Sequence, residues 1–260
     1  MAIPPHPSRD VITSTSLSPR HKLACWAVHI YTSLGLPINL LSLWALTQGK
    51  GKVFFCLNLL AVSIDATDGF MARKLNVKTA LPQFDGAKLD DLIDYLTFTF
   101  LPISALYYLQ LIPESYWPLL GFALISSAYG FCQTQAKTEE AFVGFPSYWN
   151  LVVYYIFLLR PELWINVTVI IALSALTFVP IHFIYPTRTV MWQKTTLVGA
   201  VLYVITLIYS ALGEDPKHRL WSGYTSLIYV AYYWLASALH HRRIHRVDQS
   251  DLNIDSGDQK

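Results

Sequence analysis

Long apolar stretches, separated by short polar or proline-containing segments, limit what this sequence can fold into. The stretch from Leu23 to Gln48 contains no Asp, Glu, Lys or Arg. As a helix rising about 1.5 Å per residue, it would cross a hydrocarbon core about 30 Å thick. Of the 260 residues, 53% are hydrophobic and 14% are charged, whereas about 25% charged residues is usual in soluble domains. The sequence therefore favours a membrane protein over an ordinary soluble globular fold.

Further apolar stretches follow the first, so we expect about eight membrane-spanning helices, with six to eight as the range. The predicted fold is all-α, a polytopic integral membrane helix bundle over residues 23–240, with tails at 1–22 and 241–260. The stretch 147–160 is short for a full span, and we expect it to be a partial or tilted span. The others are 53–72, 91–112, 117–136, 163–184, 196–213 and 219–240.

Loop charges indicate the orientation of the bundle, because Lys and Arg concentrate on the cytoplasmic side of membrane proteins. With the N-terminus inside, most of the 19 basic residues fall on that side. We therefore assign both termini and the loop from Arg73 to Lys88 to the cytoplasm. The net charge of +2 is too balanced for a nucleic-acid-binding surface.

Four carboxylates interrupt two of the expected helices. Asp65 and Asp68 are three residues apart and Asp90 and Asp94 are four apart, so each pair lies on one face of its helix. An isolated charge within a span costs roughly 2.5 to 3.5 kcal/mol, which makes a functional site the default interpretation. Antiparallel neighbouring helices would bring the four together, and such oxygen ligands suit Mg²⁺ or Mn²⁺.

A simpler explanation covers only part of this set. Asp90 and Asp91 could stabilise the start of a helix through its dipole. That explanation leaves Asp65, Asp68 and Asp94 without a reason to be there, so the sequence favours a cation site.

The same region resembles the signature of the CDP-alcohol phosphotransferases, D-x2-D-G-x2-A-R followed after a spacer by G-x3-D-x3-D. The spacer has twelve residues, more than in most members. Every fixed position is present, namely Asp65, Asp68, Gly69, Ala72, Arg73, Gly86, Asp90 and Asp94.

The resemblance implies a role for each carboxylate. Asp65, Asp68 and Asp90 would ligate two divalent ions, Mn²⁺ or Mg²⁺, that hold the pyrophosphate of a CDP substrate. Asp94 would be the catalytic base that deprotonates the acceptor alcohol, and it would also contact the second ion. The resemblance further implies a homodimer.

The remaining motif residues are expected to help bind the CDP moiety together with Asp65 and Asp68. Gly69, Ala72 and Gly86 lack side-chain bulk, which would let a base or pyrophosphate approach helix backbone. Arg73 offers a fixed fork of donors to phosphate oxygens.

The long spacer, the expected spans and the segment 145–150 resemble the bacterial branch of this family that joins CDP-diacylglycerol to choline. That branch releases CMP and works in the inner membrane, with its active site facing the cytoplasm. A quaternary ammonium is commonly held over aromatic faces, so we expect Tyr148 and Trp149 to contact choline. Glu139 or Glu140 would balance the cation. The alternative for these aromatic residues is the interfacial belt of membrane proteins.

Two other functions compete with this one. The first is the same transferase chemistry with serine, glycerol phosphate or inositol as acceptor. Binding of an anionic acceptor would require several basic side chains near the site. Beyond Arg73, only Arg188 and Lys194 are candidates for this role. The second is an ion-coupled transporter, which usually has repeated halves. The sequence has no evident internal repeat.

Overall fold

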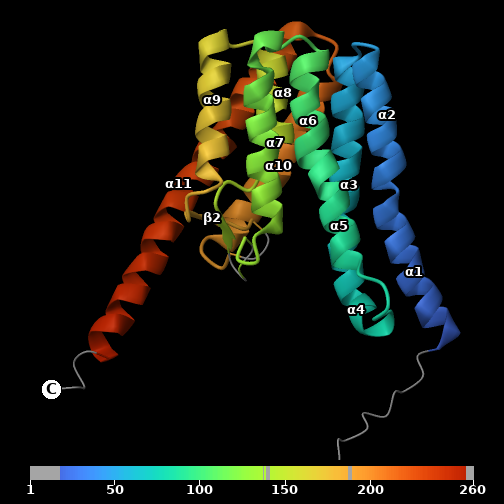
Figure 1. The fold of residues 1–260 in the computed structure, drawn as a ribbon, viewed down its shortest axis with the longest axis vertical. Coiled ribbons are helices and arrows are strands. Elements are labelled where there is room, and N and C mark those ends of the chain that lie inside the picture. The colour runs from blue at the N-terminus through green and yellow to red at the C-terminus, as the bar shows by residue number, and fades with distance from the viewer. Residues whose placement is uncertain (1–17, 137, 139–140, 187–188, 256–260) are drawn as a thin grey trace, which may run out of the picture.

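The computed structural model describes residues 18–255, apart from 137, 139–140 and 187–188, and side chains up to residue 244. The described chain is mostly helical (Figure 1). Its main helices are α1 (Pro19–Ser33), α2 (Gly35–Thr47), α3 (Gly51–Lys74), α4 (Val77–Ala80), α5 (Gly86–Asp94), α6 (Leu101–Tyr108), α7 (Trp117–Cys132), α8 (Trp149–Leu159), α9 (Leu163–Leu176), α10 (Gln193–Leu212) and α11 (Pro216–Asp255). A π-helical segment, η1, covers Tyr95–Phe100, and a 3-10 turn, η2, covers Glu114–Tyr116.

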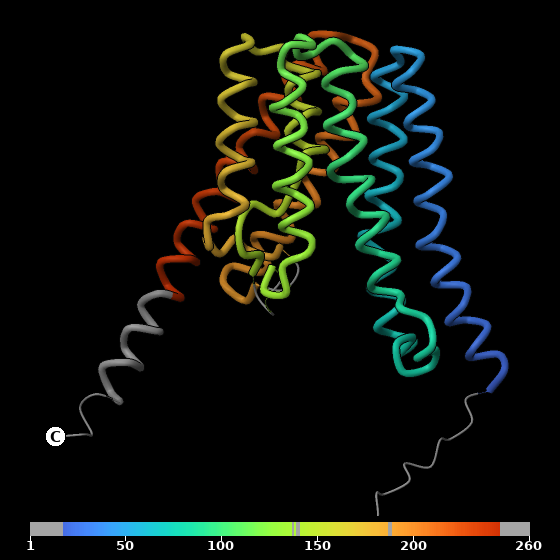
Figure 2. The backbone as a smooth tube through the Cα atoms, in the orientation of Figure 1, coloured from blue at the N-terminus to red at the C-terminus, as the bar shows by residue number. Residues whose placement is uncertain are grey.

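Each expected apolar stretch overlaps at least one helix of the described chain, although 163–184 forms α9 only up to Leu176 and ends in a strand. Helices α1 and α2 follow each other with only Leu34 between them, and Figure 2 traces them as one rod. Among the described residues, three helices are long and apolar enough to cross a membrane, namely Pro19–Thr47, Gly51–Lys74 and Gln193–Leu212. The stretch expected to be short forms α8, which has 11 residues; at 1.5 Å per residue this is about 16 Å. These findings agree with a mostly helical membrane protein, whereas the expected count of six to eight spans stays a prediction.

Two short strands add a feature that the all-α prediction missed. β1 (Ala141–Val143) pairs antiparallel with β2 (His182–Ile184), with Phe142 opposite Phe183. They lie at one end of α8 and α9 (Figure 1). Strands of three residues carry too little alternation of apolar and polar residues to be recognised from sequence.

The helices form a bundle from which two arms extend at the same end (Figure 1). The start of α1, the whole of α4 and the start of α5 make one arm, and the second half of α11 makes the other. The main apolar core lies in the bundle, and Phe54, Leu106, Trp149 and Ile170 are among its fully buried members. A smaller cluster in the first arm joins Cys25 and Val28 of α1 to Val77, Ala80 and Leu81.

Helix boundaries differ from the predicted domain limits. α1 begins at Pro19, before Leu23, and Ser18 caps it by accepting the His21 N–H at 3.3 Å. At the other end, α11 continues past residue 240 to Asp255. No Gly or Pro occurs between residues 224 and 255, so nothing in the local sequence ends the helix earlier. The basic segment therefore extends the last helix.

Candidate active site

The sequence motif occupies two neighbouring helices joined by the spacer. Asp65 and Asp68 lie on α3, and Asp90 and Asp94 lie on α5. The chain reverses after α3 through Asn76, which has a left-handed backbone with φ of 51°. The long spacer then forms α4, whose apolar residues are buried against α1. The additional spacer residues thus build a packed turn that sets α5 beside α1 and α3.

Three of the four motif carboxylates converge as the sequence predicted. Asp65, Asp68 and Asp90 each offer a ligand atom, and these atoms all lie within 4.8 Å of one another. Asp68 is buried, with 5% of its surface exposed, while Asp65 and Asp90 are half-buried. Three hard oxygen ligands so close together have the chemistry of a divalent cation site. We call this group the aspartate cluster.

Asp94 is not part of the aspartate cluster among the described residues. It ends α5, one helical turn beyond Asp90, and the π-helical segment η1 begins at the next residue. Asn39 and Asn58 hold that segment by donating to the hydroxyl and the carbonyl of Thr97 at 2.9 and 2.7 Å. Single π turns are frequent at functional sites, and here the turn fixes the helix directly after Asp94.

Helix α1 supplies a contact to the cluster that the sequence did not reveal. The hydroxyl of Thr32 donates to Asp68 Oδ2 at 2.7 Å, and Thr32 is buried with 7% of its surface exposed. One residue earlier, the Tyr31 hydroxyl pairs with that of Thr67 at 2.9 Å. Both bonds tie α1 to the face of α3 that carries the motif. Thr32 therefore fixes the orientation of the Asp68 carboxylate.

The small motif residues have different surroundings. A methyl group added to Gly86 would lie 2.5 Å from Cε1 of His29, so the absence of a side chain there allows α1 to pack closely. Ala72 packs against the small cluster between α1 and α4. At Gly69, the only close neighbour of an added methyl group is the guanidinium of Arg73, at 3.1 Å. Gly69 and the exposed Arg73 thus remain accessible beside Asp68, whereas Ala72 and Gly86 face helix α1.

The two aromatic residues that were expected to contact choline have different surroundings in the structure. Trp149 is fully buried, its indole N–H donates to Ser127 Oγ at 2.7 Å, and it contacts Phe145 edge-on. It is therefore a core residue. Tyr148, by contrast, lines two cavities. Glu139 and Glu140 lie outside the described residues.

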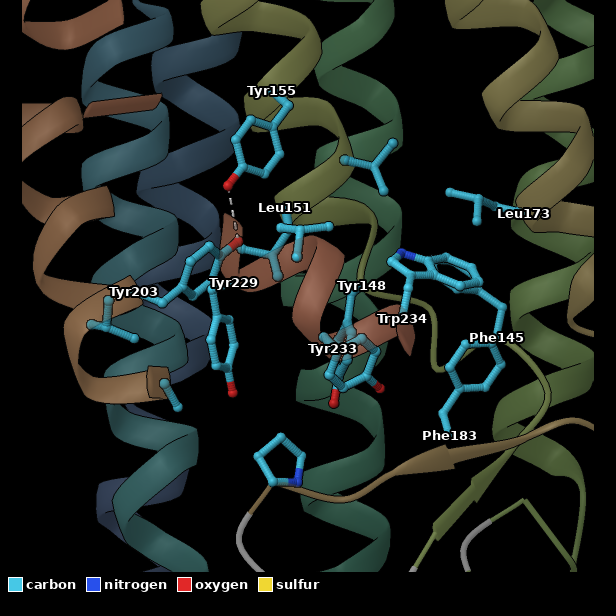
Figure 3. Close-up of a pocket in the computed structure, with 15 residues that line it drawn as sticks. Phe145, Tyr148, Leu151, Tyr155, Leu173, Phe183, Tyr203, Tyr229, Tyr233 and Trp234 are labelled. Carbon is cyan, nitrogen blue, oxygen red and sulfur yellow. Dashed lines mark hydrogen bonds between the residues drawn. The ribbon is translucent and has the colours of Figure 1, made fainter. Parts of the chain in front are cut away.

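The first cavity, of about 320 Å³, borders the aspartate cluster, and we call it the aspartate cavity. Asp65 forms part of its wall, together with residues of α3, η1, α8 and α10, among them Asn58, Phe98 and Tyr203. The second cavity, of about 260 Å³, lies between α8, α10 and α11, and we call it the aromatic pocket (Figure 3). The two cavities share part of their walls, formed by Tyr148, Leu151, Pro186, Tyr203 and Val204.

Comparison with known proteins identifies the family. The chain is 36% identical to the phosphatidylcholine synthase of Borreliella burgdorferi over 83% of its own length and 93% of that protein. The chain belongs to the phosphatidylcholine synthase family. Similar relatives carry the same name in Pseudomonas aeruginosa, with 36% identity over 74% of this chain and 81% of the relative, and in Legionella pneumophila, with 31% over 82% and 87%. No protein-family model matches the chain.

Membership in the phosphatidylcholine synthase family confirms the predicted resemblance and the predicted function. It also confirms the enzyme class, a transferase of phospholipid biosynthesis. The alternative of an ion-coupled transporter loses its support, because the carboxylates that suggested it belong to a motif in a member of an enzyme family.

Proposed function

We propose that this protein transfers the phosphatidyl group of CDP-diacylglycerol to the hydroxyl of choline and releases CMP. The observation that carries this proposal is the aspartate cluster, built by two helices that hold every fixed residue of the motif. Its position beside a cavity with a largely apolar wall suits a substrate with a charged pyrophosphate and a lipid part.

Asp65, Asp68 and Asp90 are the residues that would hold two divalent ions, Mn²⁺ or Mg²⁺. The donor set fits, because it consists of three carboxylates whose ligand atoms lie within 4.8 Å. Bound ions would neutralise negative charge on the pyrophosphate oxygens. Arg73 lies within electrostatic range of Asp68, and its exposed guanidinium beside Gly69 would donate to a phosphate oxygen.

Asp94 would take the proton from the choline hydroxyl. The choline oxygen then attacks the phosphorus that bears the diacylglycerol, and the bond between that phosphorus and the bridging pyrophosphate oxygen breaks in line, releasing CMP. The place of Asp94, one turn beyond Asp90 and outside the cluster of three, supports a role as base. Contact of Asp94 with a second ion stays a prediction.

The charges around the cavities favour choline over an anionic acceptor. Of the described residues, no Lys or Arg lines the aspartate cavity or the aromatic pocket. Inositol and serine carry no net negative charge, so this argument does not exclude them. The assay below distinguishes them from choline as acceptors. Arg188 lies outside the described residues.

We place the enzyme in the bacterial inner membrane with its active site facing the cytoplasm. The start of α1, helix α4 and the end of α11 lie at the same end of the molecule, and the turn between α2 and α3 lies at the opposite end (Figure 1). The first end carries Arg73, Lys74 and Lys78, which supports a cytoplasmic assignment. The homodimer that the resemblance implies stays a prediction.

An acceptor assay tests the proposed function. Purified protein in detergent micelles is supplied with CDP-diacylglycerol and Mn²⁺, and the release of CMP is followed with choline, serine, inositol or glycerol phosphate. We expect CMP and phosphatidylcholine to form in equal amounts with choline only. Product formation with another acceptor and none with choline would contradict the proposed acceptor, and chelation of Mn²⁺ should stop the reaction.

Thr32→Val is expected to raise the Mn²⁺ concentration needed for half-maximal rate by about 10- to 100-fold, the usual effect of losing a hydrogen bond that orients a metal ligand. The change removes the hydroxyl that holds Asp68 and keeps the shape of the side chain. Titrating the initial rate with Mn²⁺ measures this concentration. Thr32→Ser keeps a hydroxyl and should have the wild-type Mn²⁺ requirement.

Ser33→Ala is the matched control for this variant. The Ser33 hydroxyl donates only within α1, to the carbonyl of His29 at 2.8 Å. Its loss should leave the Mn²⁺ dependence unchanged. An unchanged Mn²⁺ dependence in Thr32→Val would show that Thr32 does not position Asp68.

A further inference from the structure

The aromatic pocket is walled by an unusual concentration of rings. Its walls include tyrosines 148, 155, 203, 229 and 233, together with Phe145, Phe183 and Trp234. Segments far apart in sequence contribute these rings, because Tyr148 directly precedes α8, Phe183 lies on β2, Tyr203 lies on α10, and Tyr229 and Tyr233 lie on α11. Several rings contact each other at the edge or face, among them Tyr148 with Tyr233 and Phe183 with Trp234.

The tyrosines give the pocket two different ends (Figure 3). At one end, the Tyr155 hydroxyl donates to that of Tyr203 at 3.3 Å. The hydroxyls of Tyr148, Tyr229 and Tyr233 point toward the opposite end, where the strands lie. The rings of these three tyrosines therefore remain in the pocket wall, and their polar ends point away from the pair of Tyr155 and Tyr203.

Tyr148 connects the pocket to the chemistry. It also lines the aspartate cavity, in which Asp65 forms part of the wall. Phe98 of η1, the segment that begins directly after Asp94, lines the same cavity. A molecule that filled the aromatic pocket beside Tyr148 would thus extend toward the proposed base.

A small cation matches this arrangement better than a lipid chain does. A trimethylammonium group cannot donate hydrogen bonds and is attracted to the faces of aromatic rings. The ionised carboxylate of the proposed base Asp94 would stabilise its charge, since attraction between opposite charges is stronger in a site that excludes water. A neutral acyl chain would be buried against the rings as well, but it would gain no electrostatic attraction from the ring faces or from Asp94.

We propose that Tyr148, Tyr229 and Tyr233 form the binding site for the trimethylammonium group of the acceptor. This inference rests on the proposed function, and it names the rings that select choline. The ammonium lies in the aromatic pocket, and the two-carbon arm passes Tyr148 and presents the hydroxyl to Asp94. Tyr229 and Tyr233 are thus specificity-determining residues.

The test measures two Michaelis constants separately in Tyr229→Leu and Tyr233→Leu. Each variant removes one ring and should raise the KM for choline by about 10- to 30-fold, the effect of losing a desolvated cation–π contact. The KM for CDP-diacylglycerol should stay within about twofold of wild type. Tyr229→Phe and Tyr233→Phe keep the ring and should retain a KM for choline near that of wild type, which separates loss of the ring from loss of folding.

Tyr224→Leu is the matched control, because Tyr224 lies on α11 with 56% of its surface exposed and lines neither cavity. Tetramethylammonium should inhibit wild type in competition with choline and should inhibit the two Leu variants less strongly. A raised KM for CDP-diacylglycerol with an unchanged KM for choline would assign the pocket to a lipid chain and overturn the inference. Failure of the proposed function would appear earlier, as no choline-dependent CMP release by wild type.

Discussion

Asp94→Asn is expected to lower kcat by about 10²- to 10⁴-fold, the usual contribution of general base catalysis. Asparagine has nearly the same size but cannot accept a proton from the choline hydroxyl. Because the three carboxylates of the aspartate cluster stay intact and an asparagine oxygen can still contact an ion, binding of Mn²⁺ and CDP-diacylglycerol should change far less than kcat. Single-turnover rates of CMP release measure the chemical step. Equilibrium binding of CMP in the presence of Mn²⁺ measures the affinity of the nucleotide-binding site.

Asp91→Asn provides the control on the same helix. Asp91 is exposed and lies off the motif, so its replacement should leave kcat within a few-fold of wild type. If Asp94→Asn kept more than a tenth of the wild-type rate, Asp94 could not be the base. If the same variant lost CMP binding as well, Asp94 would belong to the ion-binding set instead.

Asp68→Asn is expected to abolish binding and turnover together. Asp68 is the buried member of the aspartate cluster, and its carboxylate accepts the hydrogen bond from Thr32. An amide in its place can still accept that bond, so the fold should persist, but the negative charge is lost. We expect Mn²⁺ affinity to fall by more than about 100-fold, beyond the range usual for loss of an outer hydrogen-bond partner. Electron paramagnetic resonance of free Mn²⁺ measures this.

Asp85→Asn is the control for that variant. Asp85 caps α5 by accepting the Lys88 N–H at 3.1 Å, and an asparagine side chain can do the same. It is exposed and outside the cluster, so Mn²⁺ affinity should not change. Equal losses in Asp85→Asn and Asp68→Asn would mean that net charge, and not the cluster, attracts the ion.

The parts of the site that follow a short-range pattern were predictable from the sequence. Spacings of three and four residues place Asp65 with Asp68, and Asp90 with Asp94, on single helix faces whatever the rest of the fold does. The short connection between the two helices then requires them to be neighbours. The convergence of Asp65, Asp68 and Asp90 follows from these two facts, and the uncharged stretches predict the helices themselves.

Contacts between distant segments were not predictable. Thr32 lies in an apolar helix 36 residues before Asp68, and a single threonine there has no distinguishing spacing. Tyr148 and Trp149 are adjacent in sequence, yet one lines both cavities and the other is in the core. Only the packing of α8 decides which of two neighbouring aromatic residues faces a cavity. For the same reason, Tyr229 could not be told from other tyrosines of α11.

The central claim is that Asp65, Asp68 and Asp90 together bind the divalent ions that hold the nucleotide substrate. Anomalous diffraction at the manganese edge, from crystals grown with Mn²⁺ and CMP, tests it directly. The account predicts manganese peaks bordered by these three carboxylates, with the phosphate of CMP beside Arg73. Manganese bound elsewhere in the protein, with CMP held away from the three carboxylates, would contradict it.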